Sequence, residues 1–238
     1  MVSAAVLRKR HPILSLLKGL LRLFFRQPAV IGMEQIIQDL PAVFVCNHAD
    51  AYGPVIMSIY FPFTCRPWIH AHMMKPGLSA SYLEMDFVRK TLGWRPPFSR
   101  WLANMLSPLC IRLFRSMGSI PVYRGQMRIR ETMNTSLQVL MQGENLLIFP
   151  ENPLKEYSAH LHDFHTGFVC LARNYYRETG KCLPFYPVYI DKERGFIRIG
   201  EPALYAAGMD FRAERKRILG YLRSMIHIMA VSAKEASA

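Results

Sequence analysis

Hydrophobic positions along the chain alternate between strand-like runs and helix-like periods. Several short apolar runs predict buried strands, and one further segment alternates with a period of two. The expected strands cover 42–46, 67–74, 119–123, 145–149, 183–190 and 195–199. Segments with a helical period lie between them, at 13–25, 54–61, 101–117, 126–142, 163–177 and 211–229. Strands that alternate with helices predict an α/β fold with a mixed, largely parallel sheet flanked by helices. The helix at 101–117 is expected to break at Pro108.

The first expected helix carries a narrow polar stripe on an otherwise apolar surface. The stripe consists of Ser15, Lys18 or Gly19, Arg22 and Arg26, and leucines and phenylalanines cover the rest until Pro28. Such a helix suits the interface of a bilayer, and the alternative is packing on the protein's own core. The apolar stretch falls short of the ~18 residues that a spanning helix needs. We therefore expect residues 1–30 to be a membrane-association segment and 31–238 to be one α/β domain.

The net charge narrows the choice of partners. Among 238 residues, 30 are Lys or Arg and 17 are Asp or Glu, which leaves a formal charge of +13. Anionic lipid is the expected partner. We expect a peripheral (monotopic) protein that binds the cytoplasmic face of a membrane. Nucleic acid is not expected, because the basic residues pattern with Leu and Phe and no nucleic-acid-binding signature occurs. The five Cys form no C-x-x-C pair, so neither a zinc framework nor a disulfide scaffold is indicated.

Polar and charged residues follow three of the expected strands. Asn47-His48-Ala49-Asp50 follows the first, Tyr123-Arg124 follows the second, and Glu151 follows the third. The carboxyl ends of parallel strands meet at one edge of a sheet, so these side chains should converge. His48 can accept a proton near neutral pH, Arg124 can hold an anion in a bidentate fork, and Glu151 can accept a hydrogen bond from a hydroxyl.

Four sequence blocks occur in order within a stretch of roughly residues 40–228. They are Asn47-His48, Gly118-Ser-Ile-Pro-Val-Tyr-Arg124, Phe149-Pro150-Glu151 and Pro187-Val188. In order and spacing they resemble the glycerolipid acyltransferases typified by 1-acyl-glycerol-3-phosphate acyltransferase. The resemblance implies transfer of a fatty acyl group from acyl-CoA or acyl carrier protein to a lysolipid or glycerol-phosphate-like acceptor. It also implies no metal and no bound cofactor.

The resemblance assigns roles to particular residues. In the family the His is the general base on the acceptor hydroxyl, and an Asp five residues later orients it. His48 matches the base, and Asn47, Gly118, Arg124 and Glu151 match substrate-binding positions. We expect these roles because the resemblance implies them.

The sequence departs from the family at two positions. The place of the orienting Asp holds Gly53, so Asp50 either replaces that carboxylate or is a turn residue. The family's Glu-Gly-Thr-Arg becomes Glu151-Asn152-Pro153-Leu154, and Lys155 can supply charge but not a planar fork. These changes fit an altered acceptor, a weakened enzyme, or a relative that binds lipid or acyl thioester without turnover.

Two histidine groups invite comparison with a metal site. They are His70-x-His72 and His160-x-His162 with His165. No Cys, Asp or Glu completes a recognisable ligand set around either group. We therefore expect these histidines to form polar faces that line the substrate groove.

Overall fold

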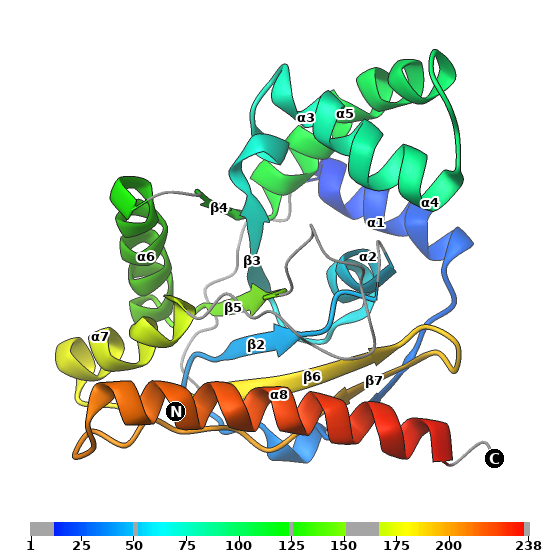
Figure 1. The fold of residues 1–238 in the computed structure, drawn as a ribbon. Coiled ribbons are helices and arrows are strands. Elements are labelled where there is room, and N and C mark those ends of the chain that lie inside the picture. Colours follow the sequence, from blue (N-terminus) through cyan, green and yellow to red (C-terminus); the bar gives the residue numbers. More distant parts are fainter. Residues whose placement is uncertain (1–11, 50–51, 124–125, 151–166, 236–238) are drawn as a thin grey trace.

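The computed structural model describes residues 12–49, 52–123, 126–150 and 167–235. In these ranges, seven strands form one sheet in the order β1-β7-β6-β2-β5-β3-β4 (Figure 1). The strands are β1 (Ala29–Ile31), β2 (Val43–Cys46), β3 (Cys65–His70), β4 (Ile120–Val122), β5 (Asn145–Ile148), β6 (Phe185–Asp191) and β7 (Phe196–Ile199). All neighbouring pairs are parallel except β6 with β7. The predicted α/β class with a mixed, largely parallel sheet is confirmed.

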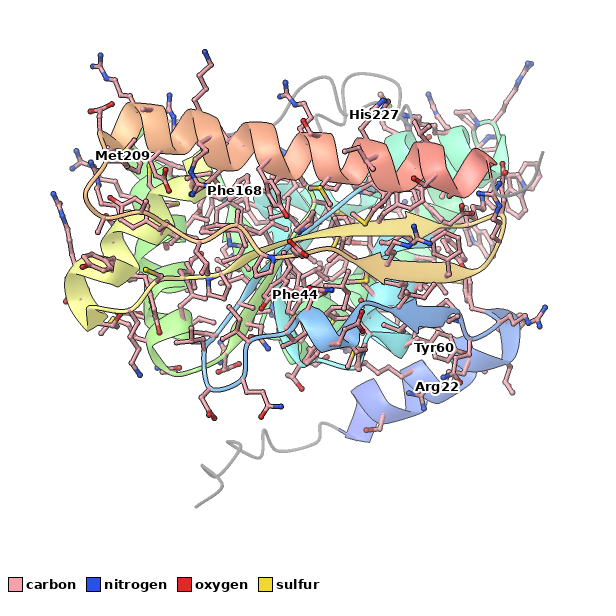
Figure 2. All side chains as sticks on the ribbon, turned by 90° about the horizontal axis from the view of Figure 1, so that it is seen from below. Arg22, Phe44, Tyr60, Phe168, Met209 and His227 are labelled. Atoms are coloured by element: carbon pink, nitrogen blue, oxygen red, sulfur yellow. The ribbon has the colours of Figure 1, made fainter. Side chains whose placement is uncertain are left out.

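Helices cover both faces of this sheet. They are α1 (Pro12–Phe24), α2 (Tyr52–Tyr60), α3 (Leu78–Leu83), α4 (Lys90–Leu92), α5 (Phe98–Ser116), α6 (Gln126–Met141), α7 (Cys170–Thr179) and α8 (Phe211–Glu235). Helices α1 and α8 lie on opposite faces of the sheet (Figure 2). Helices α3, α4 and α5 lie beyond the carboxyl end of β3 (Figure 1).

Strand β2 is buried on both faces, which explains its uninterrupted apolar sequence. Successive side chains of a strand point to opposite faces. Val43 and Val45 accordingly join the core formed with α6, α7 and α8, whereas Phe44 and Cys46 join the core formed with α2. The strand that leads to His48 is therefore held from both sides.

Helix α1 docks on α2 through one member of its basic stripe. The Arg22 guanidinium donates to the Ile59 carbonyl at 3.1 Å and lies 5.6 Å from the ring centroid of Tyr60. Figure 2 shows the Arg22 and Tyr60 side chains beside each other. The Tyr60 hydroxyl donates to the Phe25 carbonyl at 2.6 Å. Arg22 thus faces the protein, while Leu23 and Phe24 are 79% and 76% exposed. None of the helices in the described ranges combines the length and apolarity that crossing a membrane requires.

Several sequence expectations differ from the structure. The strand expected over 67–74 ends at His70, and Ala71–Met74 forms a 3-10 turn. The helix expected to break at Pro108 runs unbroken through it, because Pro108 and Asn104 are exposed and water can reach the carbonyl that loses its partner. Strand β1 was not predicted, and its pairing with β7 places the expected boundary at residue 30 inside the sheet.

Replacing Phe44 by Ala should destabilise the fold strongly. Phe44 is 1% exposed, and its ring lies 4.9 Å from that of Phe61 and 5.4 Å from that of Tyr186. The cavity should lower the free energy of unfolding by about 3–5 kcal/mol, measured by urea denaturation. Phe98→Ala, at an exposed site, should change it by less than about 0.5 kcal/mol. Equal losses in the two variants would contradict the described core.

Candidate active site

The carboxyl ends of four parallel strands meet at one edge of the sheet. Along that edge β2 is followed by β5, then β3, then β4. Val45 lies opposite Ile148 in the register, so the segments after β2 and β5 leave the sheet side by side. The structure therefore brings His48 next to the strand end that precedes Glu151. The predicted site residues Asp50, Arg124, Glu151 and Lys155, and His160, His162 and His165, lie outside the described residues.

The His48 imidazole packs beside an aromatic ring from the neighbouring strand end. The ring centroids of His48 and Phe149 are 5.2 Å apart at an interplanar angle of 54°. His48 is half-buried, and Ala49 after it has a positive φ of 45°, so the chain turns sharply there. A packed but accessible imidazole at a turn has the placement that a proton acceptor requires.

Asn47 holds the end of β2 against β6. Its side-chain amide donates to the Ile190 carbonyl at 3.1 Å, and its side-chain carbonyl accepts from the Ile190 N–H at 2.7 Å. The amide thus continues the ladder between β2 and β6 after the backbone has turned away. In this structure Asn47 positions the residue after it, and its expected substrate contact stays a prediction.

The first turn of α2 packs directly against the backbone of His48, because Gly53 has no side chain. A Cβ built at Gly53 would lie 2.3 Å from the His48 carbonyl oxygen and 3.0 Å from its carbon. Atoms of a real side chain do not approach backbone so closely, so position 53 accepts glycine alone unless His48 or α2 moves. The family's Asp therefore cannot occupy this position on this backbone. A carboxylate that orients His48 must come from elsewhere.

A phenol and a carboxylate lie next to this turn. Burial raises the pKa of the Tyr52 hydroxyl, and the negative charge of Asp191 raises it further. Asp191 accepts from the Arg194 N–H at 2.8 Å and from its guanidinium at 3.3 Å. Tyr52 thus stays protonated and able to donate a hydrogen bond beside the His48 turn. The sequence carries no motif for either residue.

Basic side chains gather where β4 ends. The Lys75 ammonium lies 5.9 Å from the Tyr123 ring centroid, and the Arg128 guanidinium lies 5.3 Å from it. Neither cation was predicted for the site. Strands are about 4.8 Å apart, so β4 lies roughly 14 Å from β2 across the sheet.

Gly118 does not join this group. It lies before β4, with a φ of 60°, and its N–H donates to the Arg115 carbonyl at 3.0 Å. This places it at the amino end of β4, whereas His48 follows the carboxyl end of β2. The turn between α5 and β4 requires the left-handed conformation that glycine adopts without strain.

The described histidine pair packs against an aromatic ring. His70 stacks on Tyr82 with centroids 5.0 Å apart, and His72 lies edge-on to His70 at 4.7 Å. In the described ranges, no group of three His, Cys, Asp or Glu residues could hold a metal ion.

Gly53→Ala should destabilise the protein by about 1–3 kcal/mol, because the methyl group would meet the His48 carbonyl. Gly53→Asp should be at least as damaging. Gly220→Ala is the matched control: α8 offers its Cβ open space, and removing a helical glycine should stabilise by about 0.5–1 kcal/mol. Thermal denaturation measures all three. A Gly53→Asp variant as stable as the wild type would disprove the close contact.

Asn47→Ala should lower the free energy of unfolding by about 1–3 kcal/mol, since it leaves both polar groups of Ile190 without their partner. Asn47→Asp should be worse, because a carboxylate oxygen would then face the Ile190 carbonyl. Urea denaturation checks the order. If the Asp variant proved as stable as wild type, the paired hydrogen bonds would be refuted.

Comparison with known proteins agrees with this architecture. The Acyltransferase family model matches residues 82–191. That range contains the blocks that end at Arg124, Glu151 and Val188, and Asn47-His48 precedes it. A comparison with curated proteins found no match.

A solved structure shares the fold. The 1-acyl-sn-glycerophosphate (LPA) acyltransferase PlsC from Thermotoga maritima aligns with a TM-score of 0.54 and 17% sequence identity. The alignment covers 91% of this chain and 78% of PlsC. At this identity the likeness concerns the fold, and the family model adds the sequence pattern. Residues 82–191 therefore resemble the Acyltransferase family in sequence, and the chain has the same α/β fold as PlsC.

Proposed function

We propose that the protein moves a fatty acyl group from an acyl thioester to a hydroxyl of a lysophospholipid or glycerol-phosphate-like acceptor at a membrane surface. The family match supports an acyltransferase in general terms. The observation that carries the proposal is the placement of the His48 imidazole at the carboxyl end of central strand β2, beside the end of β5. The donor is acyl-CoA or acyl carrier protein, and no bound cofactor is needed.

The chemistry needs one proton acceptor next to the acceptor hydroxyl. His48 takes the hydroxyl proton while the oxygen attacks the thioester carbonyl. The resulting tetrahedral centre expels the sulfur, which leaves as the thiol after receiving that proton from the imidazolium. An ester bond forms, a thioester bond breaks, and His48 returns to its neutral form. General base catalysis of this kind contributes ~10²–10⁴-fold.

The proposed proton acceptor, His48, and the basic side chains that could bind a phosphate lie at the ends of different strands. The end of β4, with Lys75 and Arg128 around Tyr123, lies roughly 14 Å from β2. We expect the Arg124 guanidinium to bind a phosphate there with two parallel hydrogen bonds. That phosphate would belong to a part of the acceptor or of the donor that lies far from the reacting hydroxyl. The basic group at β4 then positions the substrate, and His48 acts on it.

The surface of α1 supports a membrane location. Leu23 and Phe24 point away from the protein, while Arg22 anchors the helix to α2. Exposed leucine and phenylalanine on a basic helix bind shallowly at lipid headgroups. The proposed location is the cytoplasmic face of the membrane, with the protein attached as a peripheral guest.

One observation favours a second candidate, a relative that binds lipid or acyl thioester with weakened or absent turnover. Gly53 occupies the place of the family's orienting Asp, and its contact with the His48 carbonyl excludes any side chain. Loss of the orienting carboxylate weakens a histidine base because the tautomer and the imidazolium are no longer stabilised. The two candidates differ only in turnover.

His48→Ala should lower the turnover of acyl-CoA with a lysophospholipid at least ~100-fold. The rate is measured as the release of free CoA, which a thiol reagent detects. His48 is half-buried beside Phe149, so the truncated variant should stay folded and keep its melting temperature within a few degrees.

Arg177→Ala, an exposed change on α7 on the far side of the sheet from α2, is the matched control and should leave the rate unchanged. Equal CoA release by wild type and His48→Ala would exclude His48 as the base. If the wild type binds acyl-CoA but releases no CoA, the acyltransferase proposal is refuted and the second candidate, a relative that binds without turnover, is supported.

A further inference from the structure

The α3–α5 unit, residues 78–116, has its own small core separate from the two cores of the sheet. Leu83, Val88 and Ala103 are buried in it. The carboxylate of Glu84 fastens it from within, accepting hydrogen bonds from Ser99 at 2.9 Å and from Arg89 at 2.9 Å. The outer face of α5 is therefore not needed to hold the unit together.

That outer face is apolar. Phe98, Trp101, Met105 and Leu109, the α5 stripe, follow one another at steps of three or four residues and so share one side of the helix. All four are exposed, Phe98 by 69% and Trp101 by 61%, and exposed Trp94 precedes them. A row of four exposed apolar side chains, one of them a tryptophan, is unusual in water and marks an interaction surface.

The charge of the α3–α5 unit is mainly positive. Residues 78–116 hold six basic residues and two acidic ones, Glu84 and Asp86, and Glu84 forms ion pairs with Arg89 and Arg100. The basic residues are Arg89, Lys90, Arg95, Arg100, Arg112 and Arg115. Tryptophan beside arginine is the composition found at the level of lipid headgroups. A protein partner would need a matching acidic surface, whereas an anionic bilayer offers negative charge and hydrocarbon together.

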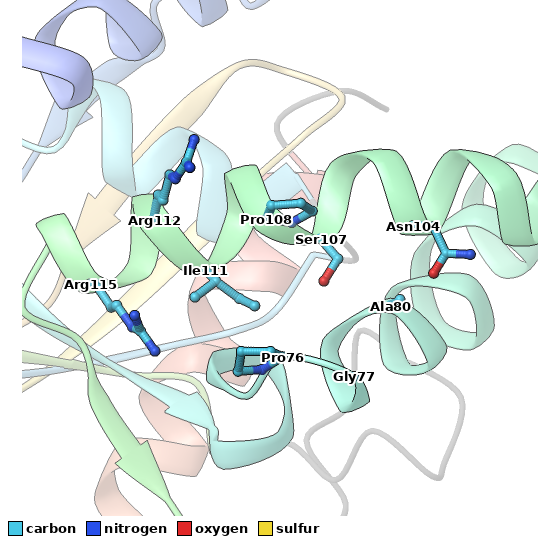
Figure 3. Close-up of a pocket in the computed structure, with 9 residues that line it drawn as sticks. All are labelled: Pro76, Gly77, Ala80, Asn104, Ser107, Pro108, Ile111, Arg112 and Arg115. Atoms are coloured by element: carbon cyan, nitrogen blue, oxygen red, sulfur yellow. The ribbon is translucent and has the colours of Figure 1, made fainter.

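A pocket lies along the inner side of the same helix. It has a volume of about 380 Å³ between α5 and the segment from Pro76 to Ala80. Ser107 and Ile111 point into this space, and Arg112 and Arg115 extend from neighbouring turns (Figure 3). In Figure 3 the Arg115 guanidinium turns toward Pro76 and the Arg112 guanidinium turns away from it, so the two do not converge on one ligand. Each can bind a phosphate-bearing headgroup by itself.

The unit also lies at the functional edge of the molecule. It follows the carboxyl end of β3, the edge where His48 leaves β2 (Figure 1). Helix α1 lies beyond the same end of β3 in this view. A surface that binds lipid here would present lipid substrates near the site.

We propose that α5 is a second membrane-docking surface, with the α5 stripe inserted among acyl chains and Arg112 and Arg115 bound to anionic headgroups. This inference names the surface that contacts the lipid. The role of that surface rests on the proposed function. Docking through α1 alone would leave the protein free to rotate about one helix. A second contact fixes the orientation of the site toward the bilayer.

Vesicle binding by the full chain tests the surface. Vesicles of phosphatidylglycerol and phosphatidylcholine in equal parts are sedimented with the wild type and with Phe98→Ser/Trp101→Ser/Met105→Ser. The triple variant should lose at least ~10-fold in affinity. Met141→Ser/Met209→Ser/Ile228→Ser, three equally exposed sites on other elements, is the matched control and should bind as wild type. Equal affinity of the α5 variant and the wild type would overturn the proposal.

The arginines are tested by lipid charge. Arg112→Gln and Arg115→Gln should each weaken binding to the mixed vesicles about fivefold and leave binding to pure phosphatidylcholine unchanged. The same loss on both lipids would exclude headgroup recognition by these residues.

Tryptophan fluorescence reports insertion directly. The chain has three tryptophans, and Trp68 is held inside by a hydrogen bond to Ser136 at 2.9 Å. Nitroxide-labelled lipid should quench the wild type, whereas Trp94→Phe/Trp101→Phe, which keeps the apolar surface, should still bind but show no quenching. A wild type that binds without quenching would overturn the proposal.

The outcomes separate this inference from the proposed function. Vesicle binding through α5 without any CoA release would refute the proposed function and leave the docking surface in place. CoA release with unchanged vesicle binding of the α5 variant would refute the docking surface alone. A wild type that dimerises through α5, with vesicle binding unaffected by the triple variant, would assign the surface to a second copy of the chain.

Discussion

The contact between Gly53 and the backbone carbonyl of His48 is the constraint on which the site depends. The first turn of α2 rests on the turn that carries the imidazole, so close that even a methyl group would collide with it. On the other side, the Asn47 amide ties the same turn to Ile190 of β6. Backbone packing and backbone hydrogen bonds thus fix the position of His48. The family resemblance expects a carboxylate from position 53 to help with this, and here the geometry leaves no room for one.

The sheet turns this local arrangement into a site. Strand β2 is buried on both faces between β5 and β6, and its parallel neighbours deliver their carboxyl ends to the same edge. The Phe149 ring, from the end of β5, packs on His48. Two strands farther along, Lys75 and Arg128 surround Tyr123 at the end of β4. One edge therefore offers a proton acceptor and a separate cationic region, the division that an acceptor with a hydroxyl and a distant phosphate requires.

Much of the fold follows from periodicity, and the failures have physical causes. The apolar run of β2 and the helical period of α8 are strong signals because burial repeats over many positions. Strand β1 has only three residues, too few to show a period. Pro108 predicts a break that solvent access to its helix removes. The contacts of Asn47 and Gly53 could not be read from sequence, because they depend on which strand lies beside β2 and how α2 approaches it.

Proton transfer by His48 is the step on which the proposed reaction depends. The most direct measurement is the pH dependence of acyl transfer to a lysophospholipid in wild type and in His48→Ala. An imidazole base predicts a rate that rises through the range where histidine loses its proton, and no such rise in the variant. A wild-type rate that is flat across that range, or a variant that keeps the same profile, would contradict the account.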